Sequence, residues 1–382
     1  MLKLLHPSFS ACIATFVLFA AVVLLPVPSL AGPVKTSSFV TPLAGDNSAI
    51  DAATLAKWSA PYRGWTYHPD PIIPANFKVP GTPAFRNFDC PCVYQLPDKP
   101  DIWYMAFIGF NGKGYNSFVV ESDDLIHWKN PRLALGFGPE GAFDFGGSVI
   151  GAFLYESWDV NAPRILKKKD GKYWTLYGAY PRQGAYELRP GYEGIAESDD
   201  GIQWRRASSE PILSVFQKDR KAWEKDCIYQ PWLVEHDGTY YNFYNAAAGS
   251  VERSGVAFSK DLFHWERYPA NPVLDVRRGG YDSKFASDPK VFRDGDHWTM
   301  FYFGLGKGGA SIMIAFSRDL LQWTADPVPL YKFGGHPTGL DKQYAHKISL
   351  VFNPKDNTFY MYYCATGNKG RTIGLLKNTV TP

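Results

Sequence analysis

The sequence predicts an all-β protein: a five-bladed β-propeller that forms a single domain behind a cleaved signal peptide. The composition points to many short strands and turns, since the 382 residues include 12 Trp, 23 Tyr, 26 Phe, 35 Gly and 29 Pro. A Ser-x-Asp-x-x-x-Trp motif also recurs along the chain, and an aromatic-rich segment precedes each copy. Several strands and tight turns, repeated at a regular spacing, are typical of sheets arranged radially around a channel.

The repeat has two parts. The turn motif occurs at residues 122–128, 198–204, 259–265 and 317–323, and its tryptophans are expected to pack in the blade cores. The aromatic strands are expected at residues 102–106, 173–177, 240–244, 297–301 and 359–363. Asp-Gly or Gly-Asp pairs precede three of these strands and predict tight hairpins. A β-sandwich would give no reason for such a repeat.

The two ends of the chain complete this organisation. Lys3, an apolar run over residues 11–26 and the small residues Ser29 and Ala31 predict a signal peptide at 1–31. Residues 32–60 are then an N-terminal extension, and residues 61–382 form the propeller, the catalytic domain. The fifth unit has no turn motif and is therefore one strand short. The segment around Trp65 to Tyr67 is expected to supply that strand and close the ring.

Charge and cysteine content limit the function classes. The formal net charge is only +3, so there is no basic excess to bind a nucleic acid. After signal cleavage we expect a secreted or periplasmic protein without membrane association. In such a compartment Cys90, Cys92, Cys227 and Cys364 could form one or two disulfides or remain buried thiols, and the sequence leaves both open.

The candidate catalytic residues lie where the first strand of each unit is expected to open into the central channel. Those openings carry Asp89, Asp159, Asp226, Asp288 and the pair His346-Lys347. Clustered carboxylates raise one another's pKa, so such a cluster is more often functional than structural. Convergent carboxyl groups together with aromatic platforms favour glycoside hydrolysis, in which one carboxylic acid protonates the leaving oxygen and one carboxylate activates water or attacks. The alternative for each Asp is a structural cap or a cross-blade ion pair.

These motifs resemble the five-bladed propeller glycoside hydrolases, most closely family 43 and its relatives in families 32, 117 and 130. The resemblance rests on Asp89-Cys90-Pro91, Asn161-Ala162-Pro163 and the Ser-x-Asp turns. In family 43 a first-blade Asp is the general base, a second-blade Asp tunes its pKa and a third-blade Glu is the acid. Asp89 matches the base, whereas Arg164 stands where the second Asp would be and Tyr229-Gln230 where the Glu-Gly would be.

The resemblance suggests replacements for the missing groups. Ser287-Asp288-Pro289-Lys290 is similar to a family 32 motif whose Asp stabilises the transition state, and His346 is similar to a channel histidine assigned as the acid in family 117. The acid therefore remains open among Asp226, Glu224, Glu252 and His346. Glu252 ranks below Asp226 and His346, because it follows an aromatic strand and is expected at the far end of its blade. Residues expected to bind substrate are Asn161, Arg164, Tyr229, Gln230, Glu252, Lys290 and Lys347.

Two other classes of function stay open. A phosphorylase of the family 130 type would need a basic cluster for inorganic phosphate, which Lys290, Lys347 and Arg164 could form. A non-catalytic sugar-binding propeller would show aromatics without convergent carboxylates. The favoured function is hydrolysis of plant or algal oligo- or polysaccharides, with a furanoside such as arabinan as the first substrate to test and anhydrogalactose-type sugars as the second. No cofactor and no catalytic metal are expected, although a structural Ca²⁺ in the channel would fit the five-bladed relatives.

Overall fold

The computed structural model describes residues 50–82, 87–184 and 189–380. All of them lie in one of the two units of the chain, Phe39–Pro382. The predicted signal peptide and most of the predicted extension fall outside the described residues. Helical structure is limited in the described part to α1 (Ala52–Ser59), η1 (Ala60–Tyr62) and η2 (Ala222–Glu224), so the predicted all-β class is confirmed. None of the described helices has the length and apolar character needed to cross a membrane.

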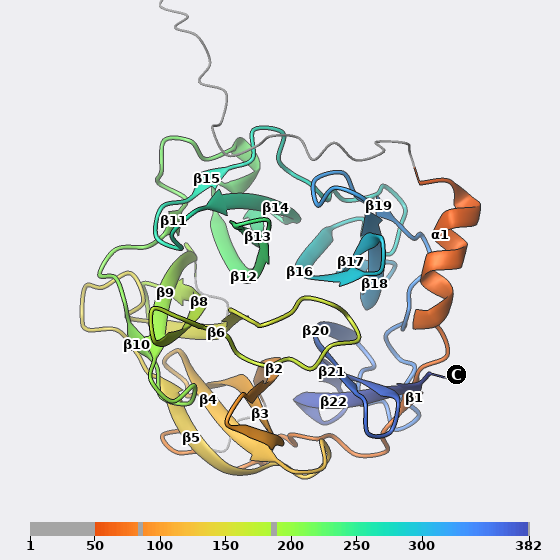
Figure 1. Ribbon diagram of the computed structural model, residues 1–382, viewed down its shortest axis with the longest axis horizontal. Coiled ribbons are helices and arrows are strands. Elements are labelled where there is room, and N and C mark those ends of the chain that lie inside the picture. The colour runs from red at the N-terminus through yellow and green to blue at the C-terminus, as the bar shows by residue number, and fades with distance from the viewer. Residues whose placement is uncertain (1–49, 83–86, 185–188, 381–382) are drawn as a thin grey trace, which may run out of the picture. The chain divides into compact units, whose positions relative to one another are not determined.

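The long strands follow one another as antiparallel groups that lie around a central axis (Figure 1). Group 1 contains β2 (Phe88–Leu96), β3 (Lys99–Phe110), β4 (Tyr115–Ser122) and β5 (Lys129–Leu135). Group 2 contains β6 (Gly147–Phe153), β7 (Lys168–Lys169), β8 (Lys172–Tyr180), β9 (Tyr192–Ser198), β10 (Arg205–Arg206) and β11 (Leu213–Ser214). Group 3 contains β12 (Cys227–His236), β13 (Thr239–Ala248), β14 (Val251–Ser259) and β15 (Glu266–Arg267). Group 4 contains β16 (Phe285–Asp294), β17 (His297–Gly306), β18 (Gly309–Ser317) and β19 (Thr324–Ala325).

The last group joins the two ends of the described chain. It contains β20 (Tyr344–Asn353), β21 (Thr358–Gly367) and β22 (Gly370–Thr379), and β1 (Thr66–Tyr67) pairs antiparallel with β22. The predicted completion of the last unit by the segment before the first is therefore confirmed. The short helix α1 precedes this strand, and its Trp58 stacks on His297 of group 4 with ring centroids 3.9 Å apart.

The repeated turn motif is held by its own side chains. In the copy at 259–265, Asp261 Oδ1 accepts hydrogen bonds from the amides of Phe263 and His264 at 2.8 Å each. Ser259 Oγ accepts one from the amide of Leu262 at 2.9 Å, and Leu262 takes a positive φ of 76°. The copies at 122–128 and 198–204 repeat both contacts, and in the copy at 317–323 Asp319 accepts from the Gln322 amide while Ser317 Oγ accepts from the Asp319 amide. Since the turn satisfies its own amides, its conformation depends little on its surroundings, and in each of the four groups that contain it a short outer strand follows.

The innermost strands share an irregularity near the channel. Each has a break in pairing register next to a residue of left-handed or unusual φ, and these residues are Cys90, Gly151, Gln230, Asp288 and Lys347. Asp89 pairs with Ile108 just before its break, and Ser287 pairs with Phe303 at the corresponding place. Such a bulge re-aims the side chains next to it. The register therefore makes Ser287, and not Asp288, the counterpart of Asp89.

One connection crosses the centre of the ring. Figure 1 shows the segment between β6 and β7 passing in front of the strands that surround the axis. It is tied to three groups: Trp158 Nε1 donates to Leu233 O at 2.7 Å, the Arg293 amide donates to Trp158 O at 2.8 Å, and the Leu166 amide donates to Gln95 O at 3.0 Å. The expectation that residues 159–163 open the innermost strand of the second unit is wrong. That strand is β6, whose glycine-led start carries neither an Asp nor a Pro.

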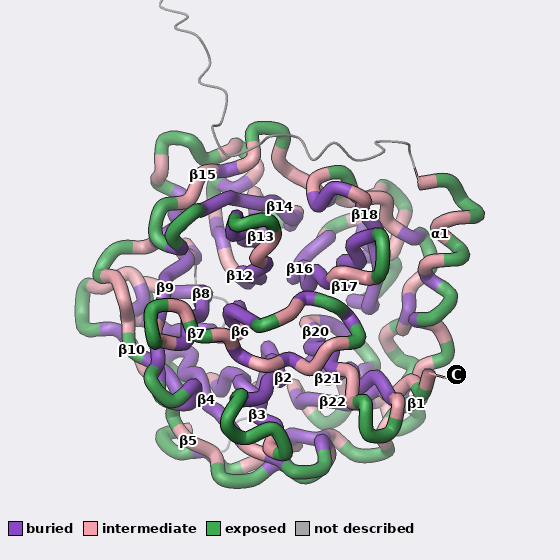
Figure 2. Tube along the Cα trace, in the orientation of Figure 1, coloured by how far each residue is buried: buried purple, intermediate pink, exposed green. Residues whose placement is uncertain are grey.

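Burial follows the radial plan. Figure 2 shows buried strands around the centre and exposed turns at the rim. The tryptophans of the turn motif pack inward as predicted, since Trp128 and Trp204 are buried and Trp265 and Trp323 lie partly buried against the main cluster. The candidate site lies at the other end of the channel, where the innermost strands begin.

Candidate functional site

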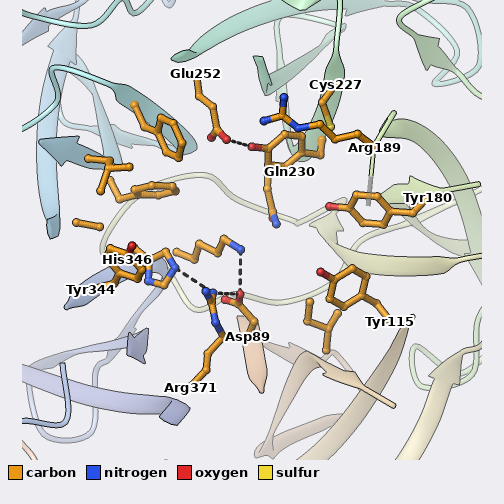
Figure 3. A pocket seen from close by; sticks show the side chains of 17 residues that line it. Asp89, Tyr115, Tyr180, Arg189, Cys227, Gln230, Glu252, Tyr344, His346 and Arg371 are labelled. Carbon is orange, nitrogen blue, oxygen red and sulfur yellow. Dashed lines mark hydrogen bonds and ion pairs between the residues drawn. The ribbon is translucent and has the colours of Figure 1, made fainter. Parts of the chain in front are cut away.

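A cavity of about 250 Å³ lies at the channel, and three sets of strand residues line it. The innermost strands contribute Asp89, Tyr229, Gln230, His346 and Lys347. The second strands contribute residues such as Ile108, Tyr180 and Phe303 near their ends. The third strands contribute Tyr115, Glu252, Ala310 and Arg371 from their first two residues. Figure 3 shows Glu252 and Asp89 on opposite sides of the cavity.

The third-strand residues reach the cavity because the hairpin between the second and third strands of each group turns at this end. Glu252 pairs with Ala247 across one such hairpin, and Arg371 pairs with Thr366 across another. The prediction that Glu252 lies at the far end of its blade is therefore wrong. The sequence does carry a signal for these positions, since each directly follows the short turn that ends the aromatic strand.

Asp89 is a buried carboxylate held by cations. Its Oδ2 accepts hydrogen bonds from Arg371 Nη1 at 2.6 Å and from Lys347 Nζ at 2.9 Å, and its Oδ1 accepts one from the Cys90 amide at 2.8 Å. Burial raises the pKa of Asp89, but the charges of Lys347 and Arg371 outweigh burial and hold that pKa well below its usual range. Asp89 is therefore ionised at any working pH.

Glu252 is a buried carboxyl group of the opposite character. It is 5% exposed, and it accepts hydrogen bonds from Tyr229 Oη, from Ser287 Oγ at 2.8 Å and from Asn245 Nδ2 at 3.4 Å. These donors are neutral, so burial dominates and raises the pKa of Glu252 despite them. Glu252 is thus the group in the cavity that tends to keep its proton.

His346 is neutral and lies beside Arg371, whose guanidinium stands between His346 and Asp89 (Figure 3). Its Nδ1 donates to Cys364 O at 2.9 Å, so its Nε2 is the acceptor that faces Arg371 Nη1 at 3.3 Å. Burial lowers the pKa of His346 to about 3, and this effect exceeds the opposing charge of Asp89. An imidazole that holds no proton on Nε2 cannot act as the acid, which argues against the role predicted for His346.

The same group does not suit the expected structural Ca²⁺. Asp89, His346 and Cys364 place ligand atoms within 4.8 Å of one another. Arg371 Nη1 already lies 2.6, 3.3 and 3.8 Å from the Asp89, His346 and Cys364 ligand atoms. Calcium prefers six or more oxygen ligands, whereas this group offers one carboxylate that is paired with cations. These residues do not fit Ca²⁺.

Aromatic side chains form part of the cavity wall. Tyr115 and Tyr180 lie next to each other with ring centroids 5.3 Å apart, and Figure 3 shows both facing the cavity from one side. Phe303 and Tyr344 lie on the opposite side around His346, at 5.3 and 5.6 Å from its ring. Such faces pack well against the apolar faces of sugar rings.

Asp288 and Lys290 lie deeper in the channel than predicted. Asp288 is buried, accepts a hydrogen bond from Lys290 Nζ at 2.7 Å and lines a second, much smaller cavity with Lys290, Gln230 and Lys347. It is not among the residues that line the main cavity. Asp288 stands at the bulge, whereas Asp89 stands one position before it.

The predicted second-unit residues lie in the crossing connection and not in the cavity. The amide of Asn161 donates to Asp159 Oδ1 at 2.8 Å, which makes this pair a local turn. Arg164 is 1% exposed, donates to Asp159 O and Val160 O at 2.8 and 3.0 Å, and stacks over Phe292 with 4.4 Å to the ring centroid. Arg164 thus stabilises this connection. It also means that Lys290, Lys347 and Arg164 do not converge as the predicted phosphate cluster.

The remaining predicted acids have structural partners outside the cavity. Asp226 Oδ2 accepts a hydrogen bond from the Gly249 amide at 2.6 Å and so caps the neighbouring hairpin. Glu224 is buried between groups, where it accepts from Tyr244 Oη at 2.6 Å and from Arg267 Nε at 2.8 Å. Neither lines the cavity. Of the predicted acids, the structure places Glu252 and His346 with Asp89.

The cysteines are thiols in this structure. Cys90, Cys92, Cys227 and Cys364 are all free and buried. Burial raises the pKa of each thiol, so none is an activated nucleophile. They serve as small packing groups around the channel.

The comparisons with known proteins agree with this architecture. The family model described as "Glycosyl hydrolases family 32 N-terminal domain" matches residues 155–336. A solved structure named for a complex of BT0996 with RGII is 24% identical with a TM-score of 0.71, over 87% of this chain and 96% of that one. A thermostable family-43 glycoside hydrolase is 14% identical with a TM-score of 0.53, over 75% and 88% of the two chains.

A third structure comes from work on the family 130 mannoside phosphorylases and the glycoside hydrolases among them that target β-1,2 mannosidic linkages in Candida mannan. It is 14% identical with a TM-score of 0.61, over 84% of this chain and 96% of that one. These proteins share the fold with this chain. The predicted resemblance to β-propeller glycoside hydrolases is confirmed, and the matches support a glycosidase.

Proposed function

We propose that this protein is an exported, five-bladed glycoside hydrolase in which Glu252 is the proton donor and Asp89 is the ionised carboxylate. One observation carries the proposal. A single cavity holds two buried carboxyl groups whose pKa values are displaced in opposite directions, Asp89 downward by cations and Glu252 upward by burial. Such a pair assigns the two roles that glycosidic cleavage needs at one pH.

The chemistry follows from the two environments. Glu252, held by Tyr229 and Ser287, donates its proton to the glycosidic oxygen as the bond to the leaving group breaks. Asp89 acts on the anomeric centre from the other side, where it activates a water or attacks the carbon itself. The sugar lies between Glu252 and Asp89, and the Tyr115 and Tyr180 rings support it from one side.

The substrate class is proposed from the predicted secretory signal and the aromatic wall of the cavity. A plant or algal oligo- or polysaccharide, with an arabinan-type furanoside first, suits an exported enzyme whose aromatic-lined cavity is the size of a small sugar. The structural neighbour named for a complex with RGII adds that glycan to the substrates worth testing. No cofactor is required by the proposed steps.

A phosphorylase is the second candidate because of one observation. Lys347, Arg371 and Arg189 converge on the cavity, although they are not the cations that the sequence suggested. A phosphorylase would use them to bind inorganic phosphate as the attacking group.

The test is product analysis on a panel of arabinan, RGII, algal galactans and aryl glycosides, with and without inorganic phosphate. We expect free sugar to be released at a rate that does not depend on phosphate. A sugar 1-phosphate as the product would instead establish phosphorolysis. Binding without any product would establish a sugar-binding propeller. Mass spectrometry of exported protein should find an N-terminus near Gly32.

A further inference from the structure

One hairpin at the cavity is longer than the others. Between β8 and β9 the chain runs from residue 181 to residue 191, whereas the corresponding connections in the other groups are residues 111–114, 249–250, 307–308 and 368–369. Arg189 lies near the end of the long connection and lines the cavity. Arg189 thus places a cation at the cavity from this longer connection, and no residue of the other four connections lines the cavity.

Arg189 is anchored by a neutral backbone group. Its side chain is exposed, and its Nη1 donates to Gly249 O at 3.1 Å, a neutral backbone acceptor. Five other arginines of this part of the chain hold carboxylates in salt bridges: Arg205, Arg206, Arg253, Arg267 and Arg277. Among the described residues, no carboxylate forms a salt bridge with Arg189. Figure 3 shows its guanidinium on the side of the cavity where Glu252 lies.

Among the described residues that line the cavity, cations outnumber carboxyl groups. Arg189, Lys347 and Arg371 face two carboxyl groups, Asp89 and Glu252, and His346 is neutral. Within this described set, the excess persists whether Glu252 is protonated or ionised. The whole chain, by contrast, is close to neutral at +3 over 382 residues. A confined cavity with fixed cations attracts an anionic ligand over a neutral one.

We propose that Arg189 binds an anionic substituent of the substrate, a sugar carboxylate or sulfate ester, beside the bond that Glu252 protonates. The inference rests on the proposed function, and it assigns acidic glycans as the substrate class. A guanidinium binds carboxylates and sulfates through paired, charge-assisted hydrogen bonds. Lys347 and Arg371 hold Asp89 and add to the positive potential that draws the anion in.

The experiment uses a matched pair of substrates and a matched pair of variants. The substrates are a uronic-acid oligosaccharide and the same oligosaccharide after its carboxyl groups are reduced to CH₂OH, so that only the charge differs. The variants are Arg189→Gln and Arg182→Gln. Arg182 is exposed on the same connection but does not line the cavity, so its variant controls for a change in the connection.

We expect the wild type and Arg182→Gln to cleave the acidic substrate with a kcat/KM at least ~10-fold above that for the reduced one. In Arg189→Gln this preference should disappear, through loss of activity on the acidic substrate alone. Equal activity of the wild type on both substrates would overturn the inference and leave the hydrolase proposal intact. A preference retained in Arg189→Gln would overturn the assignment to Arg189.

Binding separates this inference from the proposed catalysis. Calorimetry with galacturonate, galactose and inorganic phosphate should show galacturonate binding that is weakened by salt and by Arg189→Gln. If that result appears while no substrate is cleaved, the anion site stands and the hydrolase proposal is wrong. If phosphate alone binds through Arg189 and cleavage requires phosphate, the site serves phosphorolysis and the sugar-anion assignment is wrong.

Discussion

Among the described residues, the channel cavity and the seams between strand groups both contain buried carboxyl groups, and the partners of these groups differ between the two regions. In the seams a tyrosine of the second strand donates to a carboxylate in four of the groups. These pairs are Tyr177 with Asp144 at 3.0 Å, Tyr244 with Glu224 at 2.6 Å, Tyr302 with Asp282 at 2.8 Å and Tyr363 with Asp341 at 3.2 Å. Repetition at equivalent positions marks these pairs as part of the fold.

The seam carboxylates are also closed to ligands. Arg206, Arg267 and Arg277 hold three of them directly, and none of the four lines the cavity. The cavity carboxyls differ from one another as well as from the seams, since Asp89 is held by cations and Glu252 by neutral donors. Burial of a carboxyl group alone therefore does not identify a site in this fold. The site is identified by two carboxyl groups that line the same cavity and have different kinds of partner, cations for Asp89 and neutral donors for Glu252.

Asp89→Asn tests the cavity side of this comparison and should have the largest effect. We expect turnover to fall about 10³-fold or more, about 4 kcal/mol of barrier, because the ionised carboxylate is lost. Lys347 and Arg371 also lose their counter-charge, so the melting temperature should fall. Steady-state kinetics and thermal melting measure the two effects.

Asp288→Asn is the matched control. It also removes a buried carboxylate that is paired with a cation, but one that lies outside the main cavity. Its activity should stay within about tenfold of the wild type. Equal losses in the two variants would mean that the catalytic carboxylate is not distinguished by the cavity, and the assignment of Asp89 would fail.

Glu252→Gln compares the proton donor with a seam glutamate. Loss of the acid should lower turnover by about 10²–10³-fold on natural linkages and much less on aryl glycosides, whose leaving groups need no proton. The wild-type rate should decline as pH rises through the raised pKa of Glu252, and the residual rate of the variant should lack that decline. Glu193→Gln, the same change in a seam, should leave both rate and pH profile unchanged. A decline that persists in Glu252→Gln would assign the acid elsewhere.

The residues changed in these variants differ in how well the sequence predicts their positions. The repeat predicts the strand groups and the closure by β1, and it places Asp89 at the channel, where Asp89 lines the cavity because the innermost strand opens directly there. It misplaces Asp288 by one position, since a bulge shifts the register by one residue and the Asp-Pro pattern looks the same on either side of it. The sequence ranks Glu252 low because it follows the aromatic strand and is expected at the far end of the blade. In the structure the aromatic strand ends at the cavity, and the turn that follows it places Glu252 there.

Other features depend on contacts that no local pattern reveals. Arg371 meets Asp89 only because the last group lies beside the first, 282 residues away in sequence. Residues 159–164 carry the expected Asp, Asn and Pro, yet they lie in a connection that crosses the channel. Short motifs of this kind specify a turn, but the position of that turn depends on how the strand groups pack around the channel.

Glu193→Gln has its own effect, on stability. Glu193 is fully buried between groups 2 and 3, where Asn242 Nδ2 donates to it, and burial raises its pKa to about 8. The folded protein therefore keeps a proton that the unfolded chain loses above its pKa of about 4.5. Stability should fall as pH rises between these values, by an amount on the order of a few kcal/mol.

The glutamine variant is neutral at every pH and should lack this decline. The measurement is the difference in melting temperature between Glu193→Gln and wild type from pH 5 to pH 8.5. The variant should gain several °C relative to wild type across that range. A constant difference would show that Glu193 is ionised in the folded protein and that the seams tolerate an unpaired charge.

Tyr302→Phe should have the smallest effect and defines what a seam pair contributes. The hydroxyl of Tyr302 donates to Asp282 at 2.8 Å, and Arg277 holds the same carboxylate, so Asp282 keeps a partner when the hydroxyl is removed. Phe107 occupies the matching position in group 1, four residues after Trp103 as Tyr302 is four after Trp298, so the ring packs without a hydroxyl. We expect a loss of about 1–2 kcal/mol in the free energy of unfolding and no change in kcat/KM.

Urea unfolding together with kinetics on the best substrate checks both. A loss of activity greater than about tenfold would show that the seams act on the cavity, and the separation of the two regions would then be wrong.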